Sequence, residues 1–149
     1  MDWWQIEQPQ IIRVRCAAHV INLVCQEGVK ELQDTTTVVR EYAKTLGHDK
    51  AFSHFQKIQK KQRPKREAIR VPLDVTTRWN STYMMLNVAL TFRSSLDEFS
   101  RTYRNMDEYQ MNDFQWDEVE MFVSLLKPLY EATLELSRKK NPLCRRSFQ

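Results

Sequence analysis

The stretch DVTTRWNSTYMML, residues 74–86, marks the start of a long amphipathic helix. Thr76 and Thr77 are residue types that cap helix N-termini, so the helix is expected to span residues 78–102. Trp79 stands beside an arginine at the start of that helix and falls on the stripe that would face a core. The stripe consists of Tyr83, Leu86, Leu90 and Leu96, supported by Met85, Ala89, Phe92 and Phe99.

Apolar residues also recur at helical spacing on both sides of this stretch. Four more helices are expected, over residues 17–32, 34–46, 50–61 and 113–140. IIRVRC, residues 11–16, alternates β-branched and basic side chains and predicts a short strand. The fold class is therefore mainly α, a helical bundle of about five helices with one short N-terminal strand. The apolar face expected for the first helix consists of Val20, Leu23, Val24 and Leu32, widened by Ile21 and Val29.

The 149 residues suit one domain, and two glycines are too few for the turns of a many-stranded sandwich or barrel. We expect a loose lead-in over residues 1–10 and a strand–helix unit over 11–33. A helical region over 34–140, with a basic loop at 57–72, precedes a tail over 141–149. Three widely spaced cysteines, the absence of a signal peptide and the absence of a membrane-spanning apolar run predict an intracellular, reduced protein.

Positive charge is concentrated in one segment. Residues 57–70 carry seven basic side chains and one acid, a net charge of +6, whereas the whole chain carries +4. A basic cluster on a near-neutral body favours a polyanion partner such as DNA. A solvated loop without a partner is the alternative, because short basic stretches are common. The basic residues of the segment are Lys57, Lys60, Lys61, Arg63, Lys65, Arg66 and Arg70.

Two kinds of chemistry compete with a structural role for the pair Cys16 and His19. A zinc site needs four ligands, and Cys25, His48 and His54 do not provide the second close pair of a zinc finger. A nucleophilic cysteine would need an orienting group and oxyanion donors, which the sequence does not identify. The pattern therefore favours a buried cysteine and a histidine in the first helical turn. No metal and no cofactor are expected.

The pair Arg78 and Trp79 has two interpretations. Trp79 can be the first core residue of its helix, buried for its large apolar area. Alternatively, its ring stacks on an unpaired base while Arg78 contacts a phosphate, and the N–H groups of the helix N-terminus add affinity for the anion. The basic segment 57–70 enters just ahead of this position, so both interpretations stay open.

Three segments resemble blocks of a known family. RCAAHVINLV (15–24), LDVTTRWNSTYMML (73–86) and LLKPLYEATLELS (125–137) are similar, in the same order, to blocks of the hobo/Activator/Tam (hAT) DNA transposases. With their spacers these segments cover nearly the whole chain. The resemblance implies part of a ribonuclease-H-like catalytic domain that is interrupted by an all-helical insertion.

The same resemblance implies roles for single residues. Trp79 is similar to a tryptophan that stacks on a flipped base near the cleavage site, and Arg78 and His19 are similar to residues beside that DNA. The family's first two catalytic acids precede the C-x-x-H block, and the third follows the insertion. Asp2 lacks the sequence context of those acids, so no catalytic residue and no enzymatic activity are expected.

The sequence therefore predicts a transposase-derived, catalytically incomplete DNA-binding domain located in the nucleus. A protein-interaction or oligomerisation module that uses apolar helix faces and does not bind DNA is the alternative. A nuclease completed by another chain is a third interpretation. The expected DNA contacts are Arg78, Trp79, His19, Lys60, Lys61, Arg63, Lys65 and Arg66.

Overall fold

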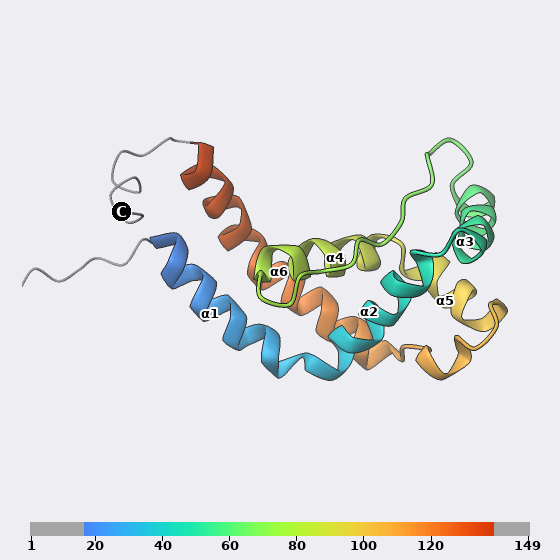
Figure 1. Ribbon diagram of the computed structural model, residues 1–149, viewed down its shortest axis with the longest axis horizontal. Coiled ribbons are helices and arrows are strands. Elements are labelled where there is room, and N and C mark those ends of the chain that lie inside the picture. The colour runs from blue at the N-terminus through green and yellow to red at the C-terminus, as the bar shows by residue number, and fades with distance from the viewer. Residues whose placement is uncertain (1–16, 139–149) are drawn as a thin grey trace, which may run out of the picture.

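The computed structural model describes residues 17–138, and the regular structure within them is helical (Figure 1). The mainly helical fold class is therefore confirmed. The strand expected at 11–16, the lead-in at 1–10 and the tail at 141–149 lie outside the described residues. The elements in chain order are α1 (Ala17–Glu31), α2 (Gln33–Leu46), α3 (Asp49–Gln62), α4 (Trp79–Thr91), α5 (Arg93–Thr102), the short 3₁₀ helix η1 (Asp107–Tyr109) and α6 (Asp113–Arg138).

The helix α4 lies at the centre of the packing. It contacts α1, α2 and α6, and α5 follows it in the chain and packs against α3. Figure 1 shows the start of α1 and the end of α6 at one end of the molecule, and α3 with α5 at the other. Aromatic and aliphatic side chains from these helices form one buried cluster. Its largest fully buried members are Trp116, Tyr42, Phe55 and Phe99.

The single helix expected over residues 78–102 is two helices, so this expectation is wrong. Phe92 interrupts it with φ −110° and ψ 22°, and α4 ends and α5 begins on either side of this residue. The Phe92 ring is buried, and its N–H donates to two carbonyls in the last turn of α4. The break directs α5 toward α3, where Phe99 packs edge-on against Phe55. Apolar spacing continues across a one-residue break, so periodicity does not reveal it.

The buried face expected for residues 17–32 is corrected in part, because Leu32 is buried as expected but Val20, Leu23 and Val24 are exposed. The side of α1 toward the core carries the buried Cys25, with Ile21 and Val29 partly buried beside it. A helix with apolar residues on two sides has two candidate buried faces, and the positions of α4 and α6 select between them. The apolar residues left exposed on α1 are Val20 (46%), Leu23 (41%) and Val24 (63%).

Two expected helix ends are confirmed. α2 stops at Gly47, whose N–H donates to the carbonyls of Ala43 and Lys44. The φ of Gly47 is an ordinary −62°, but a Cβ there would lie 2.9 Å from the Lys44 carbonyl oxygen, so a larger residue would clash. α6 begins after Asn112, whose side-chain oxygen accepts from the Gln115 N–H (2.9 Å) while Gln115 Oε1 accepts from the Asn112 N–H (3.0 Å).

Candidate nucleic-acid interface

The basic segment spans the end of α3 and the first part of the connection to α4. Lys57 and Lys60 lie on the last turns of α3, and residues 63–78 then form a long connection without helix or strand (Figure 1). Ordering such a connection costs about 1–2 kcal/mol of backbone entropy per residue, so it needs anchors. Gln26 of α1 donates to the Thr77 carbonyl at 2.6 Å near the end of the connection. Four further anchors hold the rest of it, and they separate the basic residues that act as anchors from those that do not.

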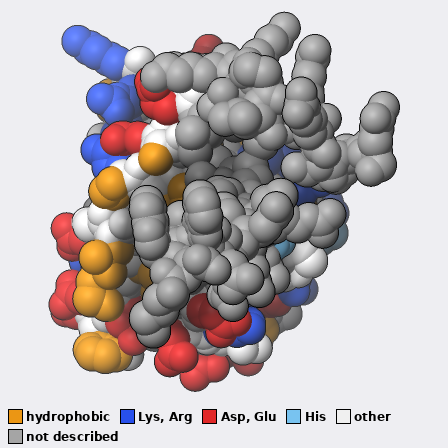
Figure 2. Space-filling model, turned by 90° about the vertical axis from the view of Figure 1, so that its left-hand side faces the viewer, with side chains coloured by type: hydrophobic (Ala, Val, Ile, Leu, Met, Phe, Trp, Pro, Cys, Tyr) orange, Lys and Arg blue, Asp and Glu red, His pale blue; other side chains and the backbone are white. Residues whose placement is uncertain are grey.

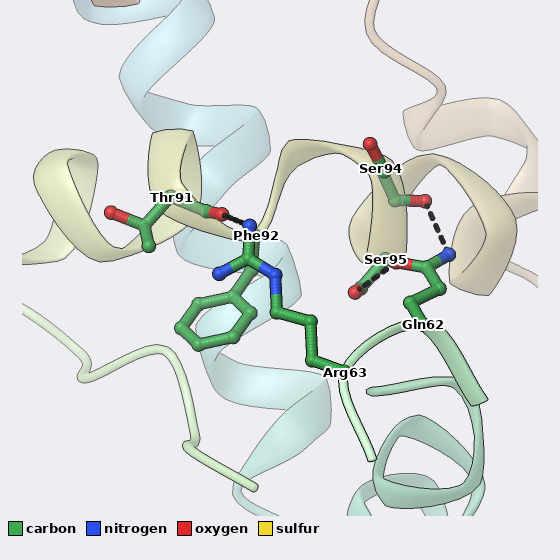
Figure 3. Close-up of a pocket in the computed structure, with 6 residues that line it drawn as sticks. All are labelled: Gln62, Arg63, Thr91, Phe92, Ser94 and Ser95. Carbon is green, nitrogen blue, oxygen red and sulfur yellow. Dashed lines mark hydrogen bonds between the residues drawn. The ribbon is translucent and has the colours of Figure 1, made fainter. Parts of the chain in front are cut away.

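The first anchor is Arg63, directly after α3. Its Nη2 donates to the Thr91 carbonyl at 3.0 Å, and its Cζ lies 5.2 Å from the centre of the Phe92 ring, so it caps the end of α4. The Ser95 hydroxyl donates to Gln62 Oε1 at 2.7 Å in the same place. These bonds join the end of α3 to the junction between α4 and α5. They surround a pocket of about 390 Å³ lined by Gln62, Arg63, Thr91, Phe92, Ser94 and Ser95 (Figure 3).

The second anchor is the amide of Gln59, which is 3% exposed. Its Nε2 donates to the Ile69 carbonyl, and its Oε1 accepts from the Ile69 N–H, both at 2.9 Å. The amide thus pairs with both backbone groups of Ile69 in the way a neighbouring strand would. A buried amide left unpaired would cost about 1–3 kcal/mol, so this pairing holds the connection against α3.

The third anchor is Arg70. Its guanidinium donates to the Gly47 carbonyl (3.0 Å) and to a carboxylate oxygen of Asp49 (2.9 Å), and its Cζ lies 4.1 Å from the centre of the Phe52 ring. Val71, the next residue, is buried. Through these three contacts Arg70 holds the connection to the start of α3.

The fourth anchor is Asp74, whose side chain is 1% exposed. Its two carboxylate oxygens accept from Arg40 Nε and Nη2, both at 2.8 Å, and one of them also accepts from the Thr82 hydroxyl at 2.7 Å. Burial alone would raise the pKa of Asp74, but the hydrogen bonds from Arg40 and Thr82 and the charge of Arg40 outweigh it and hold the pKa below its usual value. Asp74 thus ties the connection to Arg40 of α2, which lies 34 residues earlier in the chain.

The remaining basic side chains of the segment are exposed. Lys61 Nζ lies 3.5 Å from Glu98, an exposed pair of small energetic weight. Four others have no side-chain partner among the described residues and stand on the anchored backbone. They are Lys57, Lys60, Lys65 and Arg66. We call these four residues the basic patch.

Trp79 belongs to the core, with 3% of its surface exposed. Its ring meets Tyr130 of α6 edge-on, with 6.4 Å between centroids and 90° between planes, and Tyr83 packs on the same Tyr130 at 4.6 Å. This arrangement supports the interpretation of Trp79 as the first core residue of its helix. A base could stack on the ring only after the ring had left this aromatic cluster.

Arg78 and His19 are exposed, but they do not join the basic patch. Arg78 is the N-cap residue of α4, where no side chain makes a capping bond, so Thr76 and Thr77 do not cap this helix as expected. The Ser81 hydroxyl braces the turn instead, through bonds to the backbone ahead of the helix. His19 lies near the start of α1, at the end of the molecule opposite α3 (Figure 1). The expected contacts therefore do not form one surface.

Sequence reasoning missed the residues that position the patch. Gln59 lies four residues after Phe55, on the apolar side of α3, and a polar residue on a buried stripe was the available signal. Arg40 had no such signal, because it is 34 residues from Asp74 and only folding brings the two together.

The described residues also include parts of the candidate cysteine and metal sites. Cys25 is buried, and burial raises the pKa of its thiol, which disfavours a reactive thiolate. Cys16 lies outside the described residues. Within residues 17–138, no group of three or more His, Cys, Asp or Glu side chains is placed to hold a metal ion. No helix in the same part of the chain is both long and apolar enough to cross a membrane.

The helical fold and the motifs define the class of protein. Residues 14–125 match the family model described as the ZBED1 RNase-like helical domain, and the chain belongs to this family. The resemblance to hAT transposases that the three motifs carry is confirmed, since the chain is also similar to a protein named putative AC transposase from Zea mays. That protein is 28% identical over 127 residues, which cover 83% of this chain and 16% of the relative.

Two other relatives come from rice and a fungus. The zinc finger BED domain-containing protein RICESLEEPER 2 of Oryza sativa subsp. japonica is 28% identical over 147 residues, covering 89% of this chain and 18% of the relative. The putative transcriptional regulator tpeD of Talaromyces stipitatus is 28% identical over 157 residues, with the same two shares. The chain thus spans less than a fifth of the length of these relatives. No solved structure matches the chain.

Proposed function

We propose that this chain is a DNA-contacting helical domain of a transposase-derived protein and that the basic patch binds the phosphate backbone. The observation that carries the proposal is the division of the basic segment into two groups. Arg63 and Arg70 are occupied in anchoring it, whereas the four cations of the patch project from a fixed backbone with no partner among the described residues. A fixed backbone reduces the ordering cost of binding.

Binding of this kind depends on charge and not on base identity. The Trp79 ring is buried, so the proposed contact uses no stacked base. Phosphate contacts position a protein on DNA but carry no direct sequence information. Each neutralised phosphate lowers the slope of log affinity against log salt by about 0.9 on duplex DNA, so four contacts imply a slope of about −3 to −4.

The names of the relatives support the proposal of DNA binding in the nucleus. They are called a BED zinc finger protein, a transcriptional regulator and a transposase, which favours DNA as the partner and the nucleus as the location. We also propose that the domain itself does not cut DNA, because the catalytic acids implied by the hAT resemblance belong to motifs that this chain does not carry. Incubation of labelled duplex and hairpin DNA with the protein and Mg²⁺ should leave both intact.

The decisive experiment measures binding of a labelled 20-base-pair duplex by anisotropy at several salt concentrations. The test variant replaces Lys57, Lys60, Lys65 and Arg66 with Gln. The control variant removes the same charge from exposed positions elsewhere, by Gln at Lys30, Arg101, Arg104 and Lys127. The test variant should bind at least tenfold more weakly with a flattened salt slope, and the control should lose much less. Equal losses, or affinity that does not change with salt, would contradict the proposal.

A second substrate separates phosphate contact from stacking. A duplex with one unpaired base should bind as the intact duplex does, because the Trp79 ring is inside the core. A marked preference for the unpaired base that is lost in Trp79→Leu, with the fold verified, would favour the stacking interpretation instead.

A further inference from the structure

The helix α6 carries exposed apolar side chains on the side away from the core. Phe114, Met121 and Leu125 are 70%, 55% and 64% exposed. Their separations of seven and four residues place them within about 40° of one another around the helix, on a line about 16 Å long. We call these three residues the α6 stripe. The side of α6 that faces the core carries Trp116, Val119, Phe122, Val123 and Leu126.

An exposed line of large apolar side chains on one helix is the usual form of a helix-recognition surface. The side chains of the α6 stripe leave most of their apolar area unburied within the described part of the chain. They are also not needed for the fold, since α6 is already held by its buried side. Burial of the α6 stripe against the apolar stripe of another helix would therefore be energetically favourable.

Charge decides what kind of partner fits. α6 carries six acidic residues and two basic ones, a net charge of −4 in a chain of +4. Asp117, Glu120 and Glu131 are exposed along one edge of the stripe, where Lys127 is the one basic residue, so this edge is net negative. Figure 2 shows hydrophobic side chains next to acidic ones along one edge of the molecule. A surface of this sign repels the phosphates of DNA, so the stripe does not extend the basic patch.

A second copy of the chain is also a poor fit. Two α6 stripes packed antiparallel bring their acidic edges together, which like charges oppose. Packed in parallel, the acidic edge of one stripe meets an edge with Gln115 and Glu118, which supplies no positive charge. We propose that the α6 stripe docks a partner helix whose own apolar stripe is bordered by Lys and Arg.

The test uses two designed helical peptides with the same Leu stripe, one bordered by Lys and the other by Glu, titrated into the chain by calorimetry. The first variant, Met121→Ser with Leu125→Ser, removes the stripe. The second, Glu120→Lys with Glu131→Lys, reverses the edge. Val24→Ser on α1 is the matched control, because Val24 is 63% exposed on another helix. All these side chains are exposed, so circular dichroism should show an unchanged fold.

The Lys-bordered peptide should bind at least tenfold more tightly than the Glu-bordered one. Removal of the stripe should weaken its binding at least tenfold, reversal of the edge should invert the preference between the peptides, and Val24→Ser should change nothing. Three outcomes would overturn the proposal. These are no binding of the Lys-bordered peptide, binding that survives removal of the stripe, and self-association of the chain that is abolished by the same variant. DNA binding enters none of these results.

Discussion

Replacing Asp74 with Ala should destabilise the domain by about 3 kcal/mol. The Asp74 carboxylate is 1% exposed and accepts two bonds from Arg40 and one from Thr82. Arg40 is itself only 17% exposed, so loss of its partner leaves a largely buried charge without compensation. Breaking a buried pair in this way costs about 3–5 kcal/mol, and the partial access of Arg40 to water favours the lower end.

Urea and thermal unfolding followed by circular dichroism measure this loss. For a domain of this size each kcal/mol shifts the melting temperature by about 2–4 °C, so a fall of about 6–12 °C is expected. Glu27→Ala is the matched control. It breaks the Lys30–Glu27 pair, which is shorter at 2.6 Å but 65% and 74% exposed, and it should cost about 0–1 kcal/mol. Similar losses in the two variants, or less than about 1 kcal/mol for Asp74→Ala, would refute the argument from burial.

The same carboxylate predicts a pH dependence. The pKa of Asp74 is lower in the folded chain than in the unfolded chain, because Arg40 and Thr82 outweigh its burial. Its stabilising effect is therefore complete above the unfolded pKa of about 4 and is lost as the pH falls through the folded value. The free energy of unfolding should decline over that acidic range, and Asp74→Asn should make the decline shallower. An unchanged profile in Asp74→Asn would assign the decline to other carboxylates.

Three further substitutions test the anchors and the core. Gln59→Leu should cost about 1–3 kcal/mol in urea unfolding and speed tryptic cleavage after Lys65 and Arg66, because the Ile69 backbone loses both partners; unchanged cleavage would show that the other anchors suffice. Trp79→Ala should cost about 3–5 kcal/mol in the same assay, as a core tryptophan does, and a near-neutral result would contradict its burial. Leu125→Ser should change stability by less than about 0.5 kcal/mol by thermal unfolding, since the side chain is 64% exposed, and a larger loss would place it in the core.

The sequence by itself determined the local structure. Apolar residues at helical spacing were sufficient for the helical fold class. Gly47 after α2 and a capping residue type at Asn112 or Asp113 were sufficient for these two helix ends. They act within one or two turns of a helix, so their effect can be read along the chain. The three motifs likewise carried the family, because their order and spacing are properties of the sequence.

Tertiary structure decided between alternatives that the local sequence left equally possible, such as which face of a helix is buried. The spacing of α1 allowed two buried faces, and packing chose the side with Cys25. Trp79 suited either a core or a stacked base, and Tyr130 of α6, a residue distant in the sequence, holds it in the core.

The basic residues show most clearly what the sequence alone did not determine. The sequence grouped Arg63 with Lys60, Lys61, Lys65 and Arg66 as expected DNA contacts. In the structure Arg63 and Arg70 anchor the connection, whereas the basic patch has no side-chain partner within residues 17–138. The physical reason is that a cation's role depends on which carbonyl, carboxylate or ring lies within a few ångströms of it. Those neighbours come from distant segments, so only the folded chain supplies them.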